Sequence, residues 1–195
     1  GIGGLWGMQR LEGGVAAGKR AVDLGPAAPG IAADVGSIFI RARRFDEAIV
    51  QLNRILEIDS NFAVTHWFLG QAYHGKGQFA EAVAAYRKAL TFTDNPWVKA
   101  QLIRTLAKSN QRDEAVKILD GLLADSSRRY VSSATLALAY GALGDKDKAF
   151  VLFDKEIAER GPRPPQFAVV PLWDDLRDDP RFAEIMRRVQ SSKLD

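Results

Sequence analysis

Leu69-Gly70-Gln71-Ala72-Tyr73 is followed by Gly77-Gln78-Phe79-Ala80-Glu81-Ala82, and then by Tyr86 and Ala89. Small residues stand at Gly70 and Ala82, and a glycine-containing turn separates two helical patterns. This arrangement is typical of two antiparallel helices that approach closely at the small residues, while aromatic side chains fill the space between neighbouring pairs. One such pair cannot bury its own apolar face, so the stretch predicts further copies.

The pattern recurs in steps of 34 residues. One step back, Gly36 stands where Gly70 does, Phe39 replaces Tyr73 and Ala48 replaces Ala82. A second step back retains only Ala21 and Pro26. One step forward, the turn Asn110-Gln111-Arg112-Asp113-Glu114-Ala115 comes about one residue early, and a further copy fits Leu136, Tyr140, Gly144, Ala149 and Phe153.

In these residues the chain resembles the tetratricopeptide repeat, whose unit carries L-G-x-x-Y, then A-x-x-x-F, then Ala and Pro. The resemblance covers roughly residues 1–160. It implies an all-α fold, a right-handed superhelical stack of antiparallel helix pairs with a C-terminal capping helix. A generic helical bundle is the alternative, and such a bundle has no reason to keep a fixed repeat length.

The repeat register also predicts the boundaries of the repeats. A partial or degenerate N-terminal repeat spans 1–28, complete repeats span 29–62, 63–95, 96–129 and 130–161, and a linker with a capping helix spans 162–195. The expected helix pairs are 29–41 with 45–58, 63–75 with 79–92, 96–108 with 112–125, and 130–142 with 146–160.

A last helix is expected at 180–190, after the non-helical run Gly161-Pro162-Arg163-Pro164-Pro165. Asp179 and Pro180 are a typical N-cap and first-turn pair. Phe182, Ile185, Met186 and Val189 then follow at helical spacing. We expect this apolar face to cover the end of the stack, because a terminal repeat needs a cap with a polar outer face.

The run from Trp173 to Phe182 also resembles an ending, L-x-x-L-R-x-D-P-R-F, that is found in bacterial multidomain proteins. Trp173 takes the place of the first leucine. Such endings occur in helical regions of transcription regulators, adenylate cyclases and kinases. The resemblance implies an alternative function, as the C-terminal regulatory or sensing arm of a larger bacterial signalling protein.

Composition narrows the classes of protein further. The chain has 195 residues, 27 of them basic and 24 acidic, which gives a net charge of +3 without the clustered basic residues of a nucleic-acid binder. It lacks cysteine, which excludes disulfides and thiolate metal sites. No apolar run reaches the roughly 20 residues that cross a bilayer. The opening Gly1-Ile2-Gly3-Gly4 indicates either a piece of a longer protein or residues left over from cloning, and we expect the protein to be cytoplasmic.

Three patterns suggest enzyme or metal chemistry, and each is better explained otherwise. The run 13–20 approaches a phosphate-binding loop, but Arg20 stands where a magnesium-binding Ser or Thr is needed and no strand precedes it. His66 and His74 lack a third ligand at metal spacing and are expected on the surface or in the groove. The acidic cluster Asp174, Asp175, Asp178 and Asp179 is interpreted as helix capping and solvated charge. We therefore expect no enzyme activity, cofactor or metal.

The predicted function is binding of another protein or peptide in the concave groove that the first helices of the pairs line. The groove positions on the register are Asp34, Ser37, Arg41, Trp67, Gln71, His74, Trp97, Gln101, Arg104 and Lys108, with Val131, Thr135 and Leu138 in the fourth repeat. Aromatic and arginine residues are common binding hot spots. The alternative is that Trp67 and Trp97 lie buried between pairs.

The resemblance also allows one kind of partner to be disfavoured. The groove of some family members holds the terminal carboxylate of chaperone tails in a clamp of Lys, Asn and Arg. Here the corresponding positions are Ala33, Ser37, Phe68, Trp97 and Gln101. The clamp residues are absent, so we do not expect a heat-shock chaperone as the partner.

Overall fold

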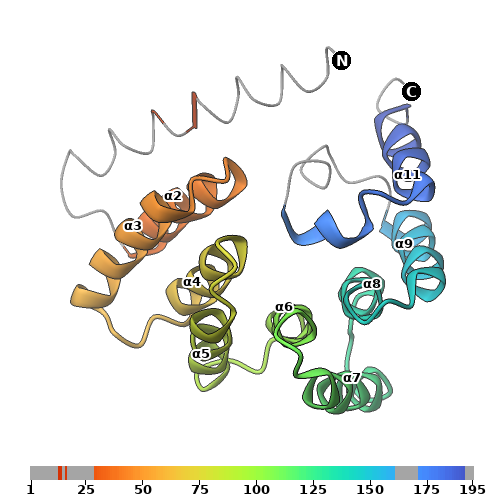
Figure 1. Ribbon diagram of the computed structural model, residues 1–195, viewed down its shortest axis with the longest axis horizontal. Coiled ribbons are helices and arrows are strands. Elements are labelled where there is room, and N and C mark those ends of the chain that lie inside the picture. Colours follow the sequence, from red (N-terminus) through yellow and green to blue (C-terminus); the bar gives the residue numbers. More distant parts are fainter. Residues whose placement is uncertain (1–12, 15, 17–28, 161–170, 192–195) are drawn as a thin grey trace. The chain divides into compact units, whose positions relative to one another are not determined.

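The computed structural model describes residues 13, 14, 16, 29–160 and 171–191. Those residues form helices and turns without any strand, so the predicted all-α fold is confirmed (Figure 1). The helices are α2 (Pro29–Arg41), α3 (Phe45–Ile58), α4 (Ala63–Gly75), α5 (Phe79–Leu90), α6 (Pro96–Lys108), α7 (Arg112–Ser126), α8 (Ser133–Ala142), α9 (Lys146–Arg160), the 3-10 helix η1 (Pro171–Leu176) and α11 (Pro180–Ser191). They belong to two compact units, Gly1–Asp94 and Asn95–Asp195, and each unit is described by itself.

Close helix crossings define the pairs of the first unit. A Cβ placed on Gly36 of α2 would lie 2.6 Å from Leu52 of α3, and one on Gly70 of α4 would lie 2.6 Å from Tyr86 of α5. Gly70 and Tyr86 come 34 residues after Gly36 and Leu52, so the two contacts join equivalent positions of the repeat. Only glycine leaves room for the facing side chain there, so the predicted role of small residues at the crossings is confirmed.

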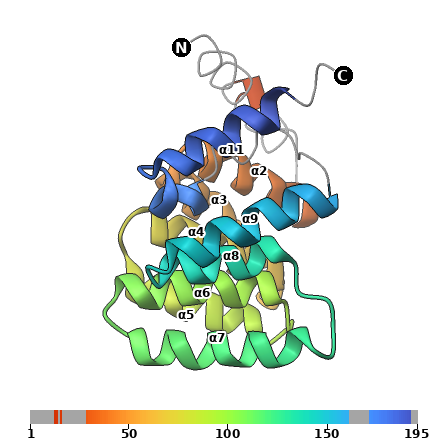
Figure 2. The same cartoon turned by 90° about the vertical axis from the view of Figure 1, so that its right-hand side faces the viewer.

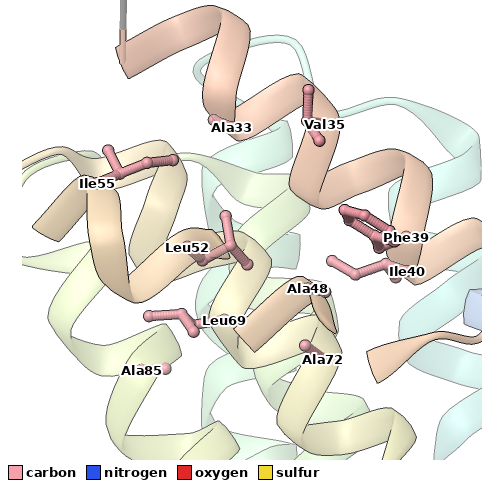
Figure 3. Packing of buried hydrophobic residues seen from close by; sticks show 10 residues of the cluster. All are labelled: Ala33, Val35, Phe39, Ile40, Ala48, Leu52, Ile55, Leu69, Ala72 and Ala85. Atoms are coloured by element: carbon pink, nitrogen blue, oxygen red, sulfur yellow. The ribbon is translucent and has the colours of Figure 1, made fainter. Parts of the chain in front are cut away.

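The core of the first unit draws on the four helices from α2 to α5 (Figure 3). Phe39 of α2 and Leu52 of α3 are almost completely buried. Leu69 and Ala72 of α4 join the same cluster, which therefore continues from one helix pair into the next. Neither pair could bury its apolar face alone, and the contact between pairs is what completes the core.

In the second unit, α6 packs against both α7 and α8, and α8 packs against α9 (Figure 2). The helix α8 begins at Ser133, whereas the repeat register predicts a start at 130. The Ser132 hydroxyl accepts a hydrogen bond from the Thr135 backbone N–H at 3.2 Å, so Ser132 is the N-cap that fixes the later start. The helix α5 also ends earlier than predicted, at Leu90.

The helix α11 confirms the prediction for 180–190, and it lies against α9. Arg181 pairs with Asp147 at 2.7 Å and Arg188 pairs with Asp154 at 2.6 Å. Phe182 is buried, with its ring centroid 6.4 Å from that of Phe153 in α9. The amphipathic pattern of this helix therefore reflects its packing on the last complete pair.

Parts of the predicted N-terminal repeat and of the 162–195 segment lie outside the described residues. The phosphate-loop-like run is described only at Gly13, Gly14 and Ala16, which are helical. The Val189 side chain also lies outside the described part. No helix among the residues that the structure describes is both long and apolar enough to cross a membrane.

Candidate functional site

Four predicted groove residues of the second unit lie on α6. Pro96 opens this helix, and the Asn95 side chain caps it by accepting a hydrogen bond from the Trp97 N–H at 2.9 Å. Gln101, Arg104 and Lys108 follow at spacings of three and four residues, which place them on one face of the helix. The local sequence therefore presents an aromatic ring, an amide and two cations along a single strip of α6.

The 3-10 helix η1 covers this strip with a carboxylate and a backbone carbonyl. Arg104 Nε lies 2.6 Å from Asp175 Oδ2, and Arg104 also donates to the Pro171 carbonyl oxygen at 3.1 Å. Lys108 Nζ lies 2.6 Å from the other oxygen of the same carboxylate. The side chains of Arg104 and Asp175 are only 7% and 15% exposed, so water screens this pair weakly.

An aromatic and apolar contact lies beside the ion pair. Trp173 of η1 is 1% exposed, and its ring lies 6.1 Å from that of Trp97 and 4.4 Å from that of Phe153, edge to face in the second case. Leu176 packs on α8, since a Cβ added to Gly141 would lie 3.1 Å from its Cδ2. The segment is thus anchored by an indole, a carboxylate and a leucine.

The charge on Asp175 is stabilised by its two cationic partners. Burial alone raises the pKa of the Asp175 carboxyl. The charge of Arg104 and the hydrogen bonds from Lys108 and Arg104 outweigh that effect and hold the pKa below its ordinary value. Asp175 is therefore ionised at neutral pH, and the contact with α6 is a true ion pair.

The interpretation of the acidic cluster is confirmed in part. Asp179 is a capping residue, since its side chain accepts a hydrogen bond from the Arg181 N–H at 3.1 Å, and hydrogen bonds from the Arg181 side chain lower its pKa to about 2. Asp174 pairs with Arg177 at 2.6 Å. Solvated charge is the wrong explanation for Asp175, because that carboxylate is bound by α6.

Three predicted groove residues of the second unit need correction. Gln101 is 1% exposed and donates to the Trp97 carbonyl oxygen at 3.4 Å, so it belongs to the interior. Thr135 and Leu138, which the register placed on the groove surface, are buried. Gln101 lies on α6, and Thr135 and Leu138 lie on α8, but none of these side chains is open to a partner.

In the first unit the predicted groove residues lie on α2 and α4, which pack against each other. Asp34 is exposed, and its carbonyl oxygen accepts a hydrogen bond from the Ser37 hydroxyl at 2.7 Å. Arg41, Trp67, Gln71 and His74 are half-buried.

Two side-chain donors in this set have no acceptor among the residues that the structure describes. Arg41 Nε and Trp67 Nε1 are covered from solvent and have no hydrogen-bond partner within the described part of the chain. The Trp67 ring stacks on Phe68 at 5.0 Å between centroids. A covered donor without an acceptor is costly, so a ligand or a rearrangement that supplies an acceptor would be favoured here.

The two histidines occupy ordinary structural positions. A ring nitrogen of His66 lies 2.8 Å from the Ser60 carbonyl oxygen, and the His74 ring lies edge-on to Phe79 at 5.3 Å. Among the residues that the structure describes, no group of three or more His, Cys, Asp or Glu side chains is placed to hold a metal ion.

Sequence reasoning missed that η1 covers the face of α6 and that Asp175 binds its two cations. Arg104 and Lys108 are four residues apart on one helix, and the cluster from Asp174 to Asp179 is the densest acidic run in the chain. Their opposite charges were a usable signal. Proximity between segments 71 residues apart in sequence cannot be derived from that signal alone.

Comparison with known proteins agrees with this architecture. Residues 73–138 match the family model of the tetratricopeptide repeat. Over 107 residues the chain is 28% identical to Superkiller protein 3 of Schizosaccharomyces pombe, a match that spans 54% of this chain and only 8% of that relative.

Solved structures of low sequence identity share the fold. TTC0263, a thermophilic tetratricopeptide protein of Thermus thermophilus, superposes with a TM-score of 0.62 at 17% identity over 97% of this chain and 94% of that chain. YrrB, described as a tetratricopeptide protein with an unusual peptide-binding site, gives 0.51 at 16% identity over 92% of this chain and 93% of that chain. The chain is thus a helical-repeat protein with the tetratricopeptide type of fold.

Proposed function

We infer that this chain is a protein-interaction module that does not catalyse a reaction. It binds a partner polypeptide on the faces of the first helices of its helix pairs. The observation that carries this proposal is the packing of η1 on α6 and α8. That face holds a stretch of polypeptide through a carboxylate, an aromatic ring and a backbone carbonyl. These are the groups that a partner peptide would also present.

The face of α2 and α4 in the first unit is the proposed site for a partner. It carries the same kinds of residue as the α6 face, with Arg41 and Trp67 as the cationic and aromatic members. Both have a covered donor without an acceptor within the described residues. Backbone carbonyls of a bound peptide would supply acceptors, and the half-buried indole of Trp67 would serve as an anchor.

The resemblance to YrrB supports a peptide ligand at the level of the fold only, because the identity is 16%. The residues themselves support the choice of ligand more directly. Ser37 stands at a clamp position, and Gln71 adds a second uncharged polar group. The face therefore offers no cluster of cations for a terminal carboxylate. We therefore propose recognition of an internal segment of the partner.

Site-specific photo-crosslinking tests this function. A photoreactive amino acid is placed at Ser37 or Gln71 on the first helices, and at Arg54 or Glu57 on the exposed side of α3 as matched controls. After illumination in an extract of the source cell, we expect one protein to be captured from Ser37 and Gln71 and not from the two α3 positions. Capture of the same protein from α3 alone would contradict the proposal.

Trp67→Ala gives the quantitative form of the test once that partner is purified. Truncating a buried aromatic anchor commonly costs roughly 2 kcal/mol of binding free energy, on the order of a thirtyfold loss of affinity. We expect the loss to appear as faster dissociation. An unchanged dissociation rate in a folded variant would show that the partner does not use Trp67.

A role as a regulatory arm of a bacterial signalling protein is a second proposal. It rests on the resemblance of the run from Trp173 to Phe182 and on the place of that run in the structure, where η1 packs on α6. If η1 left this face when a partner binds, the conformation of the C-terminal segment would change. The sequence that adjoins this chain in its gene tests the proposal, which requires an effector domain there.

A further inference from the structure

We propose that η1 is an internal ligand, and that the α6–α8 face is a binding site for segments with an aromatic residue two positions before an acidic one. This inference rests on the proposed function, because it specifies which polypeptide the second unit recognises. In the free protein Trp173 and Asp175 fill the site. A partner segment with the same spacing binds there when it displaces them.

The side chains of the face determine the spacing between the aromatic and the acidic residue of the bound segment. The indole contacts Phe153 of α9 and, at a greater distance, Trp97 near the start of α6. Arg104 and Lys108 bind the carboxylate two residues later. Arg104 also holds a backbone carbonyl, which fixes the path of the bound segment without regard to its sequence. A peptide with a lysine or an alanine at the acidic position would leave two cations without a partner, one of them almost fully covered.

The way the segment is held makes its displacement feasible. η1 is a six-residue 3-10 helix, a form with poorer hydrogen-bond geometry than an α-helix. Side-chain contacts attach it to the face, together with the hydrogen bond from Arg104 to the Pro171 carbonyl oxygen. The helix that follows has its own attachment to α9 through the pairs Arg181–Asp147 and Arg188–Asp154. The segment can therefore leave α6 while α11 stays in place.

Attachment to the same chain gives the internal segment an advantage over a free peptide. Tethered ligands of this kind act at effective concentrations on the order of millimolar. A free peptide should therefore bind the wild-type chain weakly, and its apparent affinity should rise in proportion to the fraction of chains with an open face.

The test uses the full chain and a fluorescent peptide with the sequence of residues 171–178. Asp175→Arg in the chain places a cation opposite Arg104 and Lys108, and so expels the internal segment. Asp178→Arg makes the same charge change at an exposed position and is the matched control. Fluorescence anisotropy should show that the peptide binds the Asp175→Arg chain at least about tenfold more tightly than it binds the wild type or the control.

A second peptide, with alanine in place of the residue that corresponds to Asp175, checks that the carboxylate is recognised. It should bind the Asp175→Arg chain at least about tenfold more weakly than the first peptide does. Equal binding of both peptides, or equally weak binding of the first peptide to all three chains, would overturn the proposal and make η1 a fixed structural cap. Crosslinking from Ser37 and Gln71 would be unaffected, so the two failures are distinguishable.

Hydrogen exchange of the wild-type chain decides the question if Asp175→Arg does not fold. An excess of the first peptide, on the order of several millimolar, should speed amide exchange in 171–176 and leave 180–188 unchanged. Exchange in 171–176 that does not respond to the peptide would overturn the proposal.

Discussion

Arg104 and Asp175 lie 71 residues apart in the sequence, yet Arg104 Nε and Asp175 Oδ2 are 2.6 Å apart. This ion pair places the C-terminal 3-10 segment on the face of α6. It also explains why an arginine on a first helix is buried in a protein of this fold, since its charge is neutralised within the chain.

Replacement of Asp175 by alanine should destabilise the second unit strongly. The change leaves Arg104 covered and without its carboxylate, which costs about 3 kcal/mol for a pair of this kind. Urea unfolding measures the loss. The control is Asp178→Ala, at an exposed position, which should cost less than about 0.5 kcal/mol. Losses of equal size in the two variants would show that the ion pair contributes nothing specific.

The sequence predicted the helix pairs well because their packing rule is local and periodic. Gly70 and Tyr86 belong to one repeat, and the same rule acts one period earlier at Gly36 and Leu52. The start of α8 was predicted three residues early, because the apolar pattern continues through Val131 whereas the N-cap chemistry of Ser132 sets the boundary.

The candidate site was predictable only in part, for a physical reason. The register placed Trp97, Arg104 and Lys108 on one face of α6, and in the structure all three contact η1. The register carries no information on η1, whose place depends on contacts between residues far apart in the sequence. As a result, the sequence predicted cations open to a partner and a solvated Asp175, where the structure forms an ion pair.

Acidification should weaken the attachment of η1. The folded-state pKa of Asp175 is lowered from the ordinary 3.8, so its contribution is fully present above that value and is lost as the pH falls through the lowered pKa. Urea midpoints at about pH 6 and about pH 3 measure the loss. Asp175→Asn removes the titrating group, so its midpoint should fall by less than that of the wild type. Equal falls would show that other carboxylates account for the acid sensitivity.

Gly70→Ala and Gly121→Ala should have opposite effects on stability. A Cβ on Gly70 would collide with the Tyr86 ring at 2.6 Å, which should cost about 1–3 kcal/mol. A Cβ on Gly121, within α7, would meet nothing within 4 Å, and alanine should stabilise that helix by about 0.5–1 kcal/mol. Thermal unfolding followed by circular dichroism compares them. The same sign of change in both would contradict the close crossing of α4 and α5.

Two alanines on α5 provide a test of the packing register. Ala82 is completely buried and Ala84 is exposed on the same helix. Leucine at Ala82 should overpack the crossing and cost about 1–3 kcal/mol. Leucine at Ala84 should change the free energy of unfolding by less than about 0.5 kcal/mol. If Ala84→Leu proves the more damaging variant in urea unfolding, the assignment of the buried face is incorrect.

Amide hydrogen exchange of the whole chain, with and without the partner captured by crosslinking, tests most directly whether the first helices bind polypeptide. We expect slower exchange in α2 and α4 on binding, with little change in α3 and α5. Protection confined to α3 and α5, with α2 and α4 unchanged, would contradict it.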